Sequence, residues 1–82
     1  MINHKIYEFT LMYELPNEKD DPEDYLDSLF EAGLDDSIIG LGNLGYISLY
    51  IHCKAKTLEE AVTSSIMKVN KAIPNAKMLM VF

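Results

Sequence analysis

The chain has 82 residues, of which 49% are hydrophobic and 24% are charged, a balance typical of one globular domain and unlike disorder, collagen or a coiled-coil rod. No apolar run approaches the roughly 18 residues that a membrane span needs, and the N-terminal residues do not fit a signal peptide. The formal net charge is −6, with seven lysines and no arginine, which disfavours direct binding of DNA or RNA. The single cysteine, Cys53, excludes a disulfide framework and favours a reducing, cytoplasmic setting.

Residues 5–15 alternate between apolar and mixed side chains, which is the period-two pattern of a strand with one buried face. Pro16 and Asn17 would end this strand, because proline has no N–H to donate to a neighbouring strand. The inward set would be Tyr7, Phe9, Leu11, Tyr13 and Leu15, and the opposite set Ile6, Glu8, Thr10, Met12 and Glu14.

The next pattern predicts a helix over residues 22–32. Asp21 is a favoured N-cap residue, Pro22 suits the first helical position, and acidic residues in the first turn complement the helix dipole. Gly33 is a natural residue for the C-terminal end. The residues expected at helical spacing on the inward side are Leu26, Leu29, Phe30 and Gly33.

A hairpin is predicted next, because a short apolar run at residues 37–41 is followed by glycines at positions 40, 42 and 45 and by a second alternating run at residues 46–53. In this second run one face would carry Ile47, Leu49, Ile51 and Cys53, and the other Tyr46, Ser48, Tyr50 and His52.

A second helix is predicted from the capping box at Thr57 to Glu60, and Pro74 would stop it. A last apolar run at residues 78–82 predicts a fourth strand. The inward stripe of this helix would be Leu58, Val62, Ile66, Val69 and Ile73, which recur at helical spacing.

The order β-α-β-β-α-β predicts one α+β domain over residues 1–82, a ferredoxin-like two-layer sandwich. Its antiparallel sheet would have the strand order 4-1-3-2, with both helices on one face. The opposite face would then be open to solvent or to a partner.

Two surfaces are candidates for binding a protein partner. Ten acidic residues lie between Glu14 and Asp36 against the single Lys19, and such a negative surface attracts basic partners. A solvated helix face that only keeps the domain soluble explains the same charges and is the commoner case. The acidic candidates are Asp20, Asp21, Glu23, Asp24, Asp27 and Glu31.

The second candidate surface is the open face of the predicted sheet. Its candidate residues are Met12, Tyr46, Tyr50 and His52. Monomers rarely leave a large apolar patch exposed, and tyrosine suits contact surfaces because it joins an apolar ring to a polar tip. A half-polar face that needs no partner remains an equal alternative. Base stacking, as in RNA-recognition domains, is disfavoured by the acidic charge.

No catalytic or metal-binding pattern is found in the sequence. His52 and Cys53 are adjacent on a strand and point to opposite faces, so they cannot act together, and Cys53 is expected to be a small buried apolar residue. The glycines at positions 40, 42 and 45 precede no helix, which argues against a phosphate-binding loop. We therefore expect no enzyme activity, cofactor or metal; a cleft with His52 beside a carboxylate would reopen that question.

Three blocks of sequence, YEFTL at residues 7–11, LFEAGLDD at 29–36 and TLEEAV at 57–62, resemble a group of small, largely uncharacterised bacterial proteins. In many members of that family the domain precedes a helix-turn-helix segment, which is not expected here because the chain ends at Phe82. The family often has cysteine where this chain has Leu34. The resemblance implies no enzyme activity and supplies no catalytic residues.

These observations favour a non-enzymatic, acidic protein-interaction module that regulates or inhibits a protein partner. By analogy of size and charge, it is similar to inhibitors of mobile elements, such as anti-CRISPR and antitoxin-like proteins. The alternative is a dimeric domain that senses a small molecule, since the backbone of the glycine-rich hairpin at residues 40–45 could approach a ligand closely. A homodimer is expected in either case, because the core of so short a chain is thin.

Overall fold

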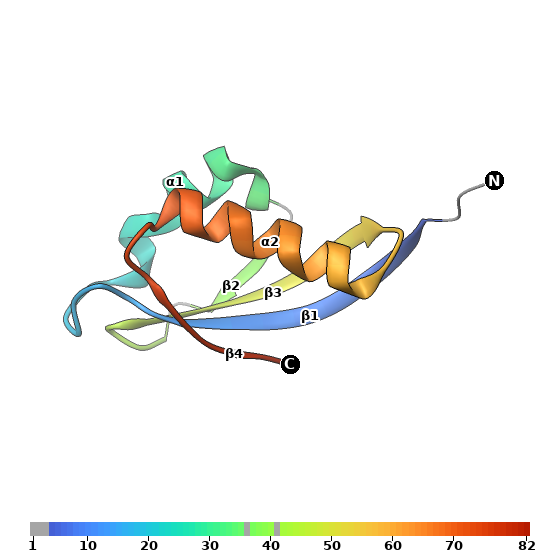
Figure 1. Cartoon of the computed structure of the whole chain (residues 1–82). Coiled ribbons are helices and arrows are strands. Elements are labelled where there is room, and N and C mark those ends of the chain that lie inside the picture. The colour runs from blue at the N-terminus through green and yellow to red at the C-terminus, as the bar shows by residue number, and fades with distance from the viewer. Residues whose placement is uncertain (1–3, 36, 41) are drawn as a thin grey trace.

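Two long strands form the centre of the sheet in the computed structural model, which describes residues 4–35, 37–40 and 42–82 (Figure 1). Strands β1 (Lys5–Glu14) and β3 (Tyr46–Ala55) pair antiparallel over all ten residues of each. β2 (Ile38–Gly40) adds to β3 and β4 (Lys77–Val81) adds to β1, so the strand order is β2-β3-β1-β4. The predicted α+β class and sheet order are therefore confirmed. Asp36 and Leu41, which the sequence places in the acidic stretch and in the second strand, lie outside the described residues.

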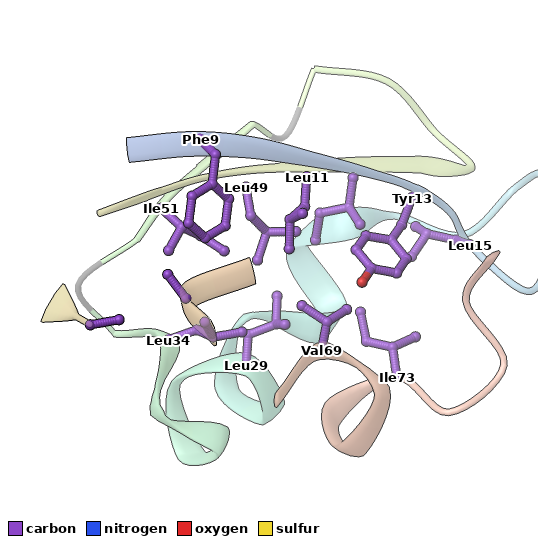
Figure 2. Packing of buried hydrophobic residues seen from close by; sticks show 13 residues of the cluster. Phe9, Leu11, Tyr13, Leu15, Leu29, Leu34, Leu49, Ile51, Val69 and Ile73 are labelled. Carbon is purple, nitrogen blue, oxygen red and sulfur yellow. The ribbon is translucent and has the colours of Figure 1, made fainter. Parts of the chain in front are cut away.

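The core lies between the sheet and the helices, because the inward rows of β1 and β3 meet the apolar sides of the helical segments. Figure 2 shows the ring of Tyr13 directed into this core, toward Val69 and Ile73. Burial of the Tyr13 side chain raises the pKa of its phenol, and its hydroxyl has no hydrogen-bond partner in the described part of the chain. The buried residues supplied by β1 and β3 are Phe9, Leu11, Tyr13, Ile47, Leu49, Ile51 and Ala55.

The first helical segment begins as predicted and then departs from regular α-helix. The Asp21 carboxylate accepts a 3.0 Å hydrogen bond from the Glu23 amide, and Pro22 opens a 3₁₀ turn that leads into α1 (Leu26–Leu29). The last turn (Phe30–Leu34) contains a kink at Gly33, whose φ of 100° confirms the left-handed conformation predicted for the C-terminal end. The chain reverses at this glycine, and Leu34 is buried after it.

The expectation that Phe30 lies on the inward stripe is wrong, because its side chain is 42% exposed in the structure. A regular α-helix would keep residues 26, 29, 30 and 33 on one side. The inward side runs through Pro22, Leu26 and Leu29, which leaves Phe30 at its margin. Gly33, in the left-handed conformation predicted for the C-terminal end, then reverses the chain and turns Leu34 into the core.

The second helix, α2 (Leu58–Ala72), has the predicted cap: the Thr57 hydroxyl accepts a 3.1 Å hydrogen bond from the Glu60 amide. Its buried line runs through Ala61, Ser65 and Val69 to Ile73, so the predicted stripe is confirmed at Val69 and Ile73, whereas small residues take its place nearer the N-terminal end. Small side chains on this line allow the helix to lie close to the sheet. Leu58, expected to be inward, is 51% exposed, and Val62 and Ile66 flank the line half-buried.

The two edges of the sheet differ in length and in regularity. β2 has three residues, whereas β4 has five, all of them exposed. The pairing of β4 with β1 shifts between Met12 and Tyr13, because Met80 lies opposite Met12 and Met78 lies opposite Tyr13. This bulge at Leu79 places Met80 on the same face as Met12. Among the described residues, no helix has the length and apolar character needed to cross a membrane.

Candidate protein-interaction surface

One face of the sheet carries no helix, and we call it the open face. Figure 1 shows α1 and α2 on the other side of the sheet. The register of the strands shows which residues lie on the open face. They are the even-numbered residues 6–14 of β1 and 46–54 of β3, with Ile38, Gly40, Lys77, Met80 and Phe82. The period-two alternation of the strands is what separates these side chains from the core.

The structure places all four residues predicted for this surface, Met12, Tyr46, Tyr50 and His52, on the open face. Tyr46 and Tyr50 are 49% and 37% exposed, and neither ring lies under the helices. Tyr50 lies opposite Thr10 on one side and Ile38 on the other, so its ring stands over the middle of the sheet.

Several apolar side chains lie with the two tyrosines on this face. We call these side chains and the tyrosines the apolar patch. Met80 lies opposite Met12, and Phe82 exchanges two backbone hydrogen bonds with Thr10, of 2.6 and 2.9 Å. The patch consists of Ile6, Ile38, Tyr46, Tyr50, Met80 and Phe82, whose side chains are between 37% and 68% exposed. Sequence patterns alone missed Ile38, which only its pairing with Tyr50 places on this face.

The charges of the open face balance one another. Glu14 lies opposite Lys77, and Glu8 lies opposite His52 with Lys54 two residues along the same strand. Two carboxylates and two ammonium groups give this face a formal charge of zero with neutral histidine, although the whole chain carries −6. The excess negative charge therefore lies on other surfaces of the protein.

The pKa of the Tyr50 phenol is raised, chiefly because neighbouring side chains remove part of its water and also because Glu8 carries a negative charge nearby. Glu8 and Tyr50 are diagonal neighbours on adjacent strands of the open face. The phenol stays protonated at neutral pH, which leaves Tyr50 able to donate a hydrogen bond to a partner.

The glycine-rich hairpin beside the open face has an internal structural role. The amide of Gly45 donates a 2.7 Å hydrogen bond to the Asp20 carbonyl, and the Gly45 carbonyl accepts a 2.8 Å bond from the Leu15 amide. Gly45 has a φ of 80°, and a Cβ there would lie 2.6 Å from the Glu18 carbonyl oxygen. At Gly40 a Cβ would collide with the Ser48 hydroxyl. These two glycines therefore serve close approach within the chain itself.

The hollow beside the glycine-rich hairpin offers little room for a small ligand. The pocket beside the hairpin, which includes Met12, Tyr46 and Ser48, holds about 100 Å³, whereas ligand sites commonly hold about 300–1,000 Å³. A larger volume of about 570 Å³ lies along the outer side of α2, but its lining residues all come from residues 57–68 and no second element forms an opposite wall.

The six acidic candidates divide into two groups in the structure. The Asp20 carboxylate accepts hydrogen bonds from the Tyr25 hydroxyl at 2.9 Å and from the Asn17 amide at 3.0 Å, and the Asp21 carboxylate caps the first helical segment. These two residues are thus used within the fold. The exposed group is Glu23, Asp24, Asp27 and Glu31, which lie along the first helical segment in the helical layer.

The side chains that could take part in catalysis or bind a metal do not lie together in one pocket. His52 lies opposite Glu8 on the open face, but both side chains are exposed, and the pocket of about 260 Å³ that includes His52 does not include Glu8. Cys53 is half-buried rather than fully buried and lines that same pocket near Lys68. Within the described residues, no group of three His, Cys, Asp or Glu side chains is placed to hold a metal ion.

Comparison with known proteins adds no relative to this description. No family model, no curated protein and no solved structure matches the chain. The apolar patch on the open face and the exposed carboxylates of the helical layer are therefore the features from which function is argued.

Proposed function

We propose that this protein is a non-enzymatic protein-interaction module that regulates or inhibits a protein partner. Its contact surface is the open face of the sheet, and its exposed carboxylates raise the rate at which a basic partner is encountered. The observation that carries the proposal is the apolar patch, in which two tyrosines and four aliphatic or aromatic side chains lie exposed over the sheet.

The composition of the patch supports a protein partner over a small ligand. Large apolar patches on small soluble proteins mark contact surfaces, and tyrosine, phenylalanine and methionine are enriched at such surfaces. The open face is broad rather than hollow, since its pocket holds only about 100 Å³. A broad surface with exposed apolar and aromatic side chains and balanced charges has the composition of a protein interface, in which Tyr, Phe and Met are enriched.

The exposed carboxylates support a partner with a basic surface. Glu23, Asp24, Asp27 and Glu31 lie in the helical layer, on the other side of the sheet from the apolar patch. A concentrated negative charge raises the rate of encounter with a basic protein and disfavours acidic ones. This separation allows the two surfaces to contribute independently.

The proposal is tested by capture of partners from the native host on the immobilised full chain. Tyr50→Lys should abolish capture of a stoichiometric protein, because a charge would then lie in the centre of the contact. Met67→Lys is the matched control, since Met67 is equally apolar and is 66% exposed on α2. Capture of no stoichiometric protein, or equal capture by both variants, would contradict the proposal.

A further inference from the structure

We propose that a second copy of this chain packs on the open face, giving a symmetric four-layer dimer with two sheets inside and two helical layers outside. This inference rests on the proposed use of the open face in protein contact: a second copy covers the face in the free protein, and a basic partner that binds the same face takes the place of that copy. In such a dimer the two apolar patches would cover each other, as the inner faces of β-sandwiches do.

The area of the patch fits a dimer interface. With roughly 200 Å² for each large apolar side chain, the six patch residues expose on the order of 600 Å². The charged and polar residues of the open face, Glu8 beside Tyr50 among them, bring the total near the roughly 800 Å² that each partner contributes to a standard interface.

The distribution of charge favours contact between like copies at this face. Two molecules that each carry −6 repel one another, and the repulsion is smallest when their neutral surfaces meet. The open face is formally neutral, and Asp24 and Asp27 lie on the far side of the sheet. Packing face to face therefore keeps the acidic residues of the two copies at the outside of the dimer.

The edges of the sheet are less suited to pairing with a second copy. β2 has only three residues, and β4 is interrupted by the bulge at Leu79 and begins with Lys77, two features that commonly prevent edge pairing. Because Phe82 bonds with Thr10, the backbone N–H and C=O of Val81 point away from β1 and lie on the free edge. Residues 5–9 of β1 have no strand beside them on the β4 side within the described residues, and the charged Lys5 and Glu8 in this stretch disfavour edge pairing.

Sedimentation velocity of the full chain over a wide concentration range tests this arrangement, with unfolding curves to show that each variant folds. The wild type and Met67→Lys should reach twice the 9.3 kDa of one chain, whereas Tyr50→Lys should raise the dimer dissociation constant by about 100-fold or more. Val81→Pro removes only the outward N–H of the edge and should leave the dimer intact. Added salt should preserve or strengthen the dimer, because it screens the repulsion between acidic copies.

Two results would overturn the inference. The first is that the wild type stays monomeric at every concentration. The second is that Val81→Pro dissociates the dimer and Tyr50→Lys does not, which would assign the contact to the β4 edge. If the chain is monomeric but still captures a host protein in a Tyr50-dependent way, the second copy is excluded and the proposed function stands.

Discussion

The hydroxyl of Tyr25 donates a 2.9 Å hydrogen bond to the carboxylate of Asp20, and the same carboxylate accepts a bond from the Asn17 amide. The pKa of the Tyr25 phenol is raised by loss of water, by this hydrogen bond and by the negative charges of Asp20 and Asp24. Asp20 thus connects the loop after β1 to the first helical segment. An acidic residue that looks in the sequence like part of a binding surface is here a structural one.

Asp20→Ala should lower the free energy of unfolding by about 1–2 kcal/mol, because it leaves the Asn17 amide and the Tyr25 hydroxyl without their acceptor. Asp24→Ala changes the net charge equally at an exposed position and should alter stability by less than about 0.5 kcal/mol. Urea unfolding of both variants provides the measurement. Equal stabilities for the two would show that the Asp20 contacts contribute nothing.

Gly45→Ala should be strongly destabilising, by roughly 2 kcal/mol or more, because it combines a φ of 80° with a collision against the Glu18 backbone. Gly42→Ala is the matched control in the same hairpin, since no atom lies within 4 Å of the position of its Cβ. That variant should keep wild-type stability or gain slightly, since alanine restricts the unfolded chain. Thermal unfolding distinguishes the two variants. A Gly45→Ala variant as stable as the wild type would contradict the described packing of Gly45 against the Glu18 backbone.

Tyr13→Phe should leave stability at neutral pH unchanged or raise it by up to about 1 kcal/mol, because it removes a buried hydroxyl without a partner. The effect at alkaline pH follows from the raised pKa of this phenol. Below the ordinary tyrosine pKa of 10.0, both the folded and the unfolded state hold the proton. Above it the unfolded state loses the proton first, so the free energy of unfolding falls as pH rises.

The corresponding measurement is the free energy of unfolding between neutral pH and pH values above the tyrosine range. Tyr13→Phe should lose less stability over that range than the wild type. Identical alkaline slopes for the wild type and Tyr13→Phe would show that this phenol ionises as readily in the folded state as in the unfolded one.

Asp27→Lys should weaken binding of a basic partner by roughly two- to fivefold at low salt, because it reverses one exposed charge of the acidic group. Glu59→Lys is the control with the same change in net charge, at an exposed position in the first turn of α2. Binding of the wild type should also fall as salt rises. If the two variants bind alike, or if salt has no effect, the acidic residues do not steer the partner.

The sequence was sufficient to predict the sheet but not the inward sides of the helices. Side chains alternate between the two faces of a strand wherever its ends are placed. The inward Ile47 and Leu49 therefore put Tyr46 and Tyr50 on the face away from the core. A helical stripe is broad, so the sequence pattern did not show that Phe30 lies at its margin, nor that the chain reversal at Gly33 buries Leu34.

Two further differences have local causes. The buried line of α2 passes through Ala61 and Ser65, because close approach to the sheet favours small side chains over the larger ones that a hydrophobicity pattern selects. The face occupied by Met80 depends on the bulge at Leu79, and a continuous apolar run gives no sign of such a bulge. The open face was therefore predictable at its centre and not at its β4 edge.

The central claim is that the open face makes contact with protein, and amide chemical-shift mapping of the isotope-labelled chain tests it most directly. Spectra are compared between dilute protein, concentrated protein and protein mixed with the captured partner. We predict that the perturbed amides cluster around Thr10, Ser48, Tyr50 and Met80. Perturbations confined to the outer side of α2, around Thr63 and Met67, with the sheet unchanged would contradict the account.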